Sequence, residues 1–278
     1  MQKLLDSWRT RKLTLFGKVQ VIKSLALPKL IFSATNTCIP STVCKTINDL
    51  MFSFIWNGKD KIKRNVVIGH PKYGGLGIPD IEIFFKSLSA TWINKLYMNS
   101  HTSWAAIAFE CFKICGSFDL ILNTNFTDVK EFPILSKLPL FYQQVVLSYN
   151  TFKSRNKPIC SKELAEQLIW GNKLFSLYNK KTHTYECLFF KSWIEEGIIF
   201  VKDIPFNNGK IGTASVASRI KDQRLLMQIY IIINALRPYK EMLINISNFH
   251  FENRNEFGDL HIGCKSKLMY SKLINTKL

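Results

Sequence analysis

Apolar residues recur at helical spacing in three stretches of the first hundred residues, and this pattern constrains the fold more than any other feature. A residue suited to the start of a helix comes before each stripe: Thr14, Ser41 after Pro40, and Asp80. The stripes consist of Leu15, Phe16, Val19, Ile22 and Ala26, then of Val43, Ile47, Leu50, Met51, Phe54 and Ile55, and then of Ile81, Phe84, Phe85, Leu88, Trp92 and Leu96. The expected fold is therefore mainly α, an irregular multi-helix bundle with a few short strands, one of them at residues 66–68.

Proline and glycine residues set the expected ends of these helices. Pro28 should kink or end the first helix, and Asn57 with Gly58 should close the second in a left-handed turn. Further helices are expected at residues 104–114, 135–149, 189–200, 214–236 and 266–274, with loops at 123–131 and 206–212. A basic, proline-ended segment at residues 154–158 is the best candidate boundary. It predicts two regions, 1–153 and 158–278, the second of them truncated at its end.

The charge of the chain is strongly positive and unevenly placed. Among 278 residues, 38 are Lys or Arg and 20 are Asp or Glu, which gives a net charge of +18. Residues 1–100 hold 15 of the basic and 5 of the acidic residues, a net charge of +10. Such a positive field attracts phosphate backbones. The alternatives are a basic surface kept for solubility and an anionic membrane surface, for which no lysine-rich amphipathic helix stands out.

Composition also limits the compartment and the general class of protein. Apolar residues make up 47% of the chain and aromatic residues 13%, which is too many for a disordered tail. The seven cysteines are odd in number and irregularly spaced, which indicates reduced thiols. The first residues turn polar at once, unlike a signal peptide, and the longest apolar run is too short to span a bilayer. A nuclear or cytoplasmic protein is expected.

Residues for several common chemistries are missing from the sequence. Two-metal nucleotide transfer needs closely placed carboxylates, yet there is no Asp-Asp pair anywhere in the chain. The glycines of residues 74–77 are followed by Ile78 and Pro79, not by the Lys-Ser/Thr of a phosphate-binding loop, so a tight turn is expected there. No metal site and no cofactor are predicted. The pair Cys111 and Cys115 lacks a second ligand pair, and loop positions are the better interpretation of three further residues, His250, His261 and Cys264.

Two basic clusters are the candidate binding residues. The first contains Arg9, Arg11, Lys12, Lys18 and Lys23, close to Trp8 and Phe16, and the second contains Lys59, Lys61, Lys63 and Arg64. Arginine can bind phosphate oxygens bidentately and lysine offers a mobile point charge. In the first cluster, Lys18 and Lys23 fall off the apolar stripe and should face outward, and Asp6 is the only acidic residue nearby in sequence. A solvated helix face is the alternative for both clusters, while Trp56 and Trp92 are expected to be core anchors.

Three blocks of the first hundred residues resemble a known family when they are taken in order. Residues 8–29, 54–64 and 74–80, the last running on to Trp92 and Ile93, resemble the region just C-terminal to the polymerase core in reverse transcriptases of LINE-type non-LTR retrotransposons. Residues 168–172, 193–204 and 266–273 continue the resemblance more weakly. The resemblance implies thumb helices that grip the template–primer duplex, with residues 8–29 in that role. The chain departs from the family because it lacks the fingers, the palm, the catalytic aspartates, the endonuclease and the Cys/His knuckle.

The expected function is therefore non-catalytic. We expect a nucleic-acid-binding fragment of a transposable element, not an enzyme, which contacts the backbone of an RNA or DNA duplex and possesses no membrane segment. The alternative is a structural scaffold segment that packs on a polymerase core of the same element and has no independent activity. An unrelated helical enzyme with a cryptic site is a third interpretation. The sequence does not distinguish RNA from DNA as the preferred partner.

Overall fold

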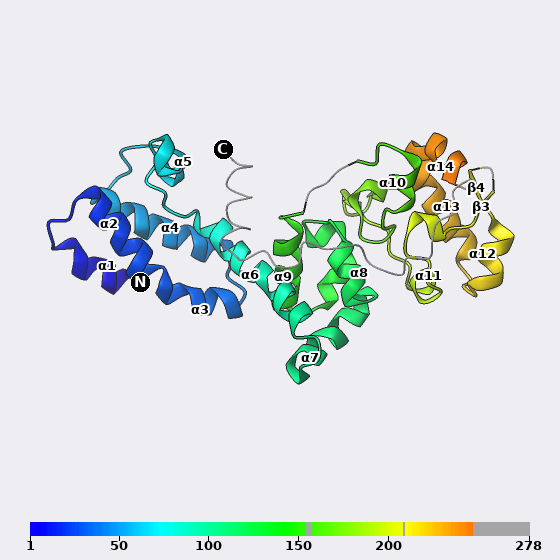
Figure 1. The fold of residues 1–278 in the computed structure, drawn as a ribbon, viewed down its shortest axis with the longest axis horizontal. Coiled ribbons are helices and arrows are strands. Elements are labelled where there is room, and N and C mark those ends of the chain that lie inside the picture. The colour runs from blue at the N-terminus through cyan, green and yellow to red at the C-terminus, as the bar shows by residue number, and fades with distance from the viewer. Residues whose placement is uncertain (154–156, 208, 247–278) are drawn as a thin grey trace. The chain divides into compact units, whose positions relative to one another are not determined.

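The computed structural model describes residues 1–153, 157–207 and 209–246, and most of its elements are helices (Figure 1). The mainly α, multi-helix fold is confirmed. The strands of the described part form two antiparallel hairpins, β1 (Leu177–Asn179) with β2 (Thr184–Glu186) and β3 (Phe206–Asn207) with β4 (Lys210–Ile211). The described residues divide into two compact units, 1–95 and 96–246. The boundary expected at residues 154–158 falls within the second unit, and whether residues 158–278 fold independently stays a prediction.

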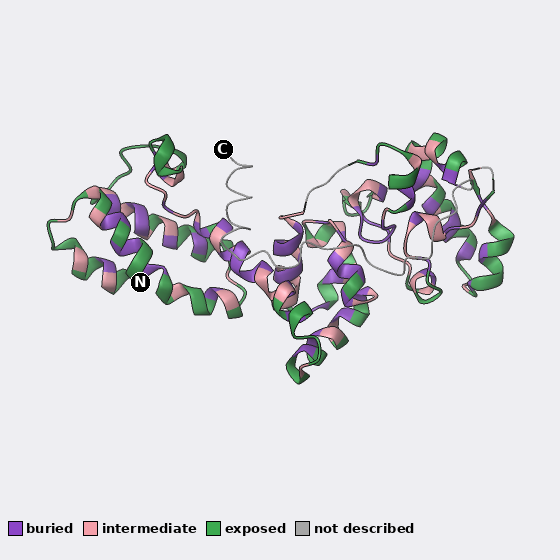
Figure 2. Ribbon diagram, in the orientation of Figure 1, coloured by how far each residue is buried: buried purple, intermediate pink, exposed green. Residues whose placement is uncertain are grey.

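The first unit has a core of helices that pack through the predicted stripes. Its elements are α1 (Gln2–Arg9), α2 (Leu15–Val21), the π-helical η1 (Ile22–Ala26), α3 (Pro28–Asn36), α4 (Ser41–Trp56), α5 (Arg64–Ile68), the 3₁₀ turn η2 (Pro71–Tyr73) and α6 (Ile81–Met98), which runs past the division between the units. Met51, Phe52 and Phe54 are buried in its centre. The short helix α5 exposes Asn65 and Val66 and buries Val67, and Figure 2 shows this mixture of exposed and covered residues.

Several helix boundaries follow the sequence. The Thr14 hydroxyl accepts a hydrogen bond from the Gly17 amide at 3.2 Å, and the Asp80 carboxylate accepts bonds from the Glu82 and Ile83 amides at 3.0 and 3.2 Å. Asn57 closes α4 in the left-handed conformation, with φ 54°. These three predictions are confirmed. Ser41 differs slightly, because it is the first helical residue of α4 and Pro40 occupies the cap position without a side-chain bond.

Pro28 both ends one helix and begins the next. The turn before it is π-helical, since the Leu27 amide donates to the Ile22 carbonyl at 2.9 Å. Pro28 then takes the first position of α3, where a missing N–H removes no helical bond. The expected break at Pro28 is thus confirmed.

The short strand expected at residues 66–68 is wrong, because this segment is the helix α5. The Val66 and Val67 amides donate to the Lys63 carbonyl at 3.0 and 3.4 Å, which is a local helical pattern. The Gly69 amide then donates to the Val66 carbonyl at 3.2 Å, and the Leu76 amide donates to the Val67 carbonyl at 2.9 Å. No strand of the described residues lies beside it, so β-branched residues alone do not make a strand there.

The second unit is built from shorter elements. They are α7 (Ser103–Phe112), η3 (Lys113–Cys115), α8 (Phe118–Asn123), η4 (Val129–Glu131), η5 (Pro133–Lys137), α9 (Leu140–Asn150), α10 (Ser161–Ala165), η6 (Lys173–Phe175), α11 (Lys191–Glu195), η7 (Val201–Asp203), α12 (Thr213–Arg219), α13 (Leu225–Leu236), η8 (Arg237–Tyr239) and α14 (Lys240–Ile246), together with both hairpins. Its core contains the fully buried Trp170 and Trp193. None of the helices in the described part is long and apolar enough to cross a membrane.

Four expected elements of the second unit need correction. The helix expected at 214–236 is two helices, because Ile220 is extended and the Asp222 carboxylate accepts from the Arg224 amide at 2.8 Å in a turn. Pro139 separates the 3₁₀ turn η5 from α9 within residues 135–149. The helix expected at 189–200 shortens to α11, ended by Gly197 at φ 76°, and the expected loop at 206–212 contains the β3–β4 hairpin. The helix expected at 266–274 lies outside the described residues.

A partly buried lysine closes the C-terminal end of α8. The Lys153 ammonium donates to the carbonyl oxygens of Leu122 and Thr124 and lies 4.8 Å from the ring centroid of Tyr149. Cations are favoured at this end of a helix because its last carbonyls carry partial negative charge. Burial nevertheless lowers the pKa of Lys153 from 10.5 to about 7.

This shift predicts a pH dependence of stability. Between about pH 7 and 10.5 the unfolded chain holds the Lys153 proton and the folded chain does not, so the free energy of unfolding should rise with pH there. Burial raises the pKa of the Cys115 and Cys187 thiols from 9.0 to about 12. Above pH 9 the folded chain therefore keeps two thiol protons that the unfolded chain loses, and these thiols should make the free energy of unfolding fall with pH. We therefore expect the urea midpoint to rise up to about pH 8.5 in the natural chain and to stay nearly flat in Lys153→Met. An equal rise in Lys153→Met and in the exposed control Lys162→Met would contradict the assignment to Lys153.

Candidate nucleic-acid interface

Lys18 is buried, which corrects the expectation that it faces outward. Its side chain is only 9% exposed, and its ammonium donates to the Ile55 carbonyl at 3.0 Å and to the Asn57 side-chain oxygen at 2.8 Å. Both acceptors lie at the C-terminal end of α4, where a positive charge is favoured. Desolvation, followed by the charges of Arg9 and Lys61, lowers the pKa of Lys18. Lys18 is therefore a structural contact between α2 and α4 and is not available to a phosphate.

The register of α2 explains this result. Leu15, Lys18, Val19 and Ile22 follow one another at the spacing of a single helix face, so the lysine occupies a core-facing position. Phe16, which the predicted stripe placed inside, is 71% exposed instead. The buried Lys18 and the exposed Phe16 therefore both differ from the usual rule that apolar residues lie inside and charged residues outside.

Arg9 fixes the end of α1 to α4. One guanidinium nitrogen donates to the Asp6 carboxylate at 3.2 Å, and another donates to the Ser53 hydroxyl at 3.3 Å. The guanidinium is half-exposed, and the Asp6 carboxylate neutralises part of its charge. Arg9 thus makes structural contacts within the first unit, and the exposed part of its guanidinium can still contact a ligand.

Arg11 and Lys12 remain exposed beyond the end of α1. The Arg11 guanidinium lies 4.1 Å from the ring centroid of Trp8, which orients it while leaving its edge open. Neither Arg11 nor Lys12 has an acidic partner within 4.0 Å among the described residues. These two residues are the freest cations of the first cluster.

The second cluster divides into a paired arginine and three open lysines. Arg64 donates to Asp49 and Asp60, both at 2.7 Å, and lies 4.7 Å from the ring centroid of Phe52. Its charge is therefore largely neutralised. The remaining members are exposed and have no ion pair with any described residue: Lys59, Lys61 and Lys63.

The structure brings part of the two clusters together at the C-terminal end of α4. Arg9 reaches this end through Ser53, Lys18 through Ile55, and Lys61 lies close enough to Lys18 to affect its pKa. In the sequence the two basic clusters are separate. The packing of α1 and α2 on α4 brings Arg9 and Lys18 of the first cluster close to Lys61 of the second (Figure 1). The one signal of this meeting point in the sequence is the helical spacing of Lys18 with Leu15, Val19 and Ile22, which places the lysine on the core-facing side of α2.

Lys23 and the glycine loop lie apart from this meeting point. The Lys23 ammonium is exposed and approaches the Leu76 carbonyl at 3.5 Å, as the outward position predicted. At Gly75 an added Cβ would lie 2.0 Å from the Gly69 carbonyl oxygen, and Gly74 has φ 86°. Only glycine allows so close an approach of two backbone segments. The expected tight turn is confirmed, and its amides are used within the fold, as in the bond from Gly77 to Gly69 at 2.9 Å.

The remaining candidate positions are structural or lie outside the described part. Trp92 donates its indole N–H to the Thr35 carbonyl, and Trp56 packs against the core of the first unit. Both tryptophans thus agree with the expected anchoring role. No group of three potential metal ligands occurs among the described residues, and three residues weighed from the sequence, His250, His261 and Cys264, lie outside them.

No model of a known protein family matches the chain. The function of the basic residues near the end of α4 must therefore be inferred from their geometry and from the ordered sequence blocks.

Proposed function

We propose that the first unit binds the sugar–phosphate backbone of a nucleic-acid duplex, as a non-catalytic part of the post-polymerase region of a LINE-type reverse transcriptase. The observation that carries the proposal is a group of exposed cations without acidic partners among the described residues, in the segments that follow α1 and α4: Arg11, Lys12, Lys59, Lys61 and Lys63. Their charges have no ion-pair partner among the described residues. A phosphate backbone would neutralise them and release its own counterions.

The chemistry of these groups favours contacts that position a duplex without reading its sequence. Lysine ammonium groups act as point charges, and the guanidinium of Arg11 stays oriented by Trp8. Lys18 and Arg64 are not part of the proposed contact surface, because protein atoms already use their hydrogen-bonding groups. Their contribution is to hold the open cations in place.

Charge reversal tests the proposal on the full chain. The triple variant Arg11→Glu/Lys12→Glu/Lys61→Glu should bind an RNA–DNA hybrid more weakly than the natural chain. Its plot of log K against log salt should be shallower by about 3 units, close to one per lost contact. Fluorescence anisotropy across salt concentrations gives both quantities. The matched control, Lys162→Glu/Lys180→Glu/Lys181→Glu, changes the net charge equally at exposed residues of the second unit. Equal effects of the two triple variants would show that net charge alone acts, which would refute the proposed surface.

A specific observation favours the second candidate, a segment that packs on a polymerase core. Phe16 and Phe32 of the first unit are 71% and 78% exposed, so a core that covered them would remove apolar surface from water. The same titration separates the two candidates. No hybrid binding at low salt, together with strong dye binding and a non-cooperative melt, would favour the packing segment. Salt-dependent binding by a cooperatively folded chain would favour the duplex interface.

A further inference from the structure

One side of α13 carries an apolar row that is exposed. Leu226, Tyr230 and Ile233 are 77%, 66% and 46% exposed, and they share one side of the helix because four and three residues separate them. Ile229 and Ile232, on the other side, are buried in the core of the second unit. An exposed apolar row of this length is typical of a surface that contacts another molecule.

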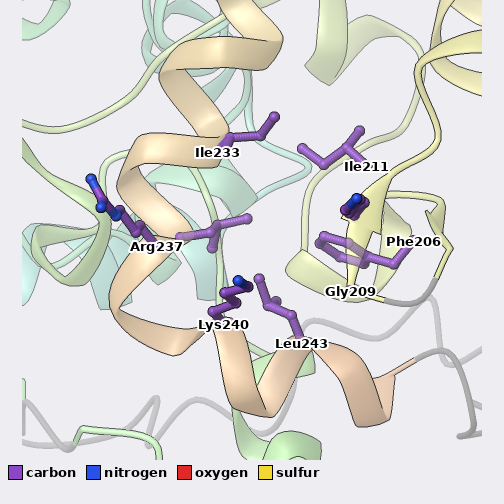
Figure 3. Close-up of a pocket in the computed structure, with 9 residues that line it drawn as sticks. Phe206, Gly209, Ile211, Ile233, Arg237, Lys240 and Leu243 are labelled. Atoms are coloured by element: carbon purple, nitrogen blue, oxygen red, sulfur yellow. The ribbon is translucent and has the colours of Figure 1, made fainter.

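The row ends at a cavity of about 400 Å³ between α13, the β3–β4 hairpin and α14 (Figure 3). Ile233 belongs to the row and also lines the cavity. In Figure 3, Ile233 points from α13 toward Ile211 of the hairpin, and Leu243 extends from α14 into the space between α13 and the hairpin. At Gly209 an added Cβ would lie 2.8 Å from a side-chain atom of Ile244, so Gly209 packs closely on α14. A cavity of this size can hold a bulky apolar side chain.

Cations lie around the cavity at the end of the apolar row. Lys210, Arg237 and Lys240 line the cavity, and no acidic residue of the described part does. All three are exposed, and none has an acidic partner within 4.0 Å in the part of the chain that the structure describes. In Figure 3, Lys240 lies beside Leu243, whereas Arg237 extends outward from the end of α13. The surface therefore combines an apolar row, a cavity at its end and a positive rim.

We propose that this surface binds an acidic amphipathic helix of a partner protein. The apolar face of the partner would cover Leu226 and Tyr230, one bulky side chain would enter the cavity, and carboxylates would meet Lys210, Arg237 and Lys240. A ligand confined to the cavity would leave about 10 Å of the row uncovered, given the helical rise per residue. Nucleic acid would satisfy the cations but leave the apolar row exposed. The proposal concerns the second unit and does not depend on duplex binding by the first.

A selection from a library of helical peptides displayed on phage, with the full chain as bait, tests the proposal. Enriched peptides should carry apolar residues at intervals of three and four together with acidic residues. The best synthetic peptide should bind about tenfold or more weakly to Tyr230→Asp and to Arg237→Glu/Lys240→Glu. Controls are Leu140→Asp, which alters an apolar residue of α9 that is 70% exposed, and Lys180→Glu/Lys181→Glu, and both should keep the natural affinity.

Several outcomes would overturn the proposal. Enriched peptides without acidic residues would remove the role of the cations, and binding that survives both Tyr230→Asp and a second variant, Leu226→Asp, would remove the role of the row. Because Tyr230 and Leu226 are exposed, these variants should fold, and circular dichroism checks that they do. Saturable binding of dodecanoate without any selected peptide would show instead that the cavity serves a small amphiphile.

Discussion

Replacing Lys18 with glutamate is expected to destabilise the first unit by about 3–5 kcal/mol, the range found when a buried charge loses its compensating partner. In the natural chain the ammonium donates to the Ile55 carbonyl and to the Asn57 side-chain oxygen. A carboxylate at this position would face two acceptors with no donor. It would also add negative charge at the C-terminal end of α4, which is already the negative end of the helix. Urea unfolding of the full chain, followed by circular dichroism, measures the change.

A second substitution at this position separates packing from hydrogen bonding. Lys18→Met keeps much of the side-chain volume and removes the donor, so a loss of about 1–3 kcal/mol is expected from two unsatisfied acceptors. Lys23→Met, at an exposed position one turn further along the chain, is the matched control and should change stability little. If Lys18 only supports the interface, Lys18→Met should leave the salt dependence of hybrid binding unchanged under conditions where the variant is folded. A stable Lys18→Met variant with a shallower salt slope would instead make Lys18 a direct phosphate contact.

Lys18 also shows where sequence reasoning about the candidate site succeeds and where it fails. The position of the first cluster and the exposure of Arg11, Lys12 and Lys23 follow from the pattern alone. The burial of Lys18 does not, because it depends on carbonyl groups that only the end of α4, thirty-seven residues away, can supply. The same holds for the neutralisation of Arg64 by Asp49, fifteen residues earlier in the chain. Partners distant in sequence therefore decide which cations remain open.

The same distinction applies to the fold: features with a local cause can be predicted from the sequence more readily than features that depend on distant contacts. Boundaries set by local chemistry, such as the Thr14 cap, the Asp80 cap and the left-handed Asn57, were predictable. The division of residues 214–236 into two helices does not follow from the periodicity, because the apolar pattern continues across the local turn that Asp222 forms. The sequence of the β3–β4 hairpin resembles a loop, because two residues on each strand give too short an alternation to indicate strands.

The weaker sequence blocks of the second unit meet in the core and form a structural pair. The Trp170 indole N–H donates to the Ile198 carbonyl at 2.8 Å, and the rings of Trp170 and Trp193 lie 6.2 Å apart. The Ile169 amide donates to the Ile199 carbonyl at 3.1 Å, beside the bridge between Leu168 and Phe200. Residues 168–172 and 193–200 are thus held to each other by backbone and ring contacts. These two blocks are therefore explained by the contact between them in the core.

This pairing makes Trp193 the position where one substitution should affect the second unit most. Its side chain is fully buried, and its indole N–H donates to the Gln228 side-chain oxygen at 2.8 Å, while the Gln228 amide donates to Asp222 at 2.8 Å. Trp193→Ala should therefore lower the free energy of unfolding by about 3–5 kcal/mol, as in other large-to-small core substitutions. Trp193→Phe keeps most of the ring but leaves the Gln228 oxygen without its donor, for a loss of about 1–3 kcal/mol.

The two tryptophan variants also test how α11 is joined to α13. If the chain from Trp193 through Gln228 to Asp222 holds the turn before α13, Trp193→Phe should increase amide hydrogen exchange at the start of α13 more than in α7. Leu140→Ala, at a position 70% exposed on α9, is the matched control and should change neither stability nor exchange appreciably. Equal stability of Trp193→Ala and the control would mean that the indole does not anchor this core. Uniform exchange in Trp193→Phe would show that α13 begins at Leu225 without help from Gln228, so that the Asp222 turn alone fixes the helix.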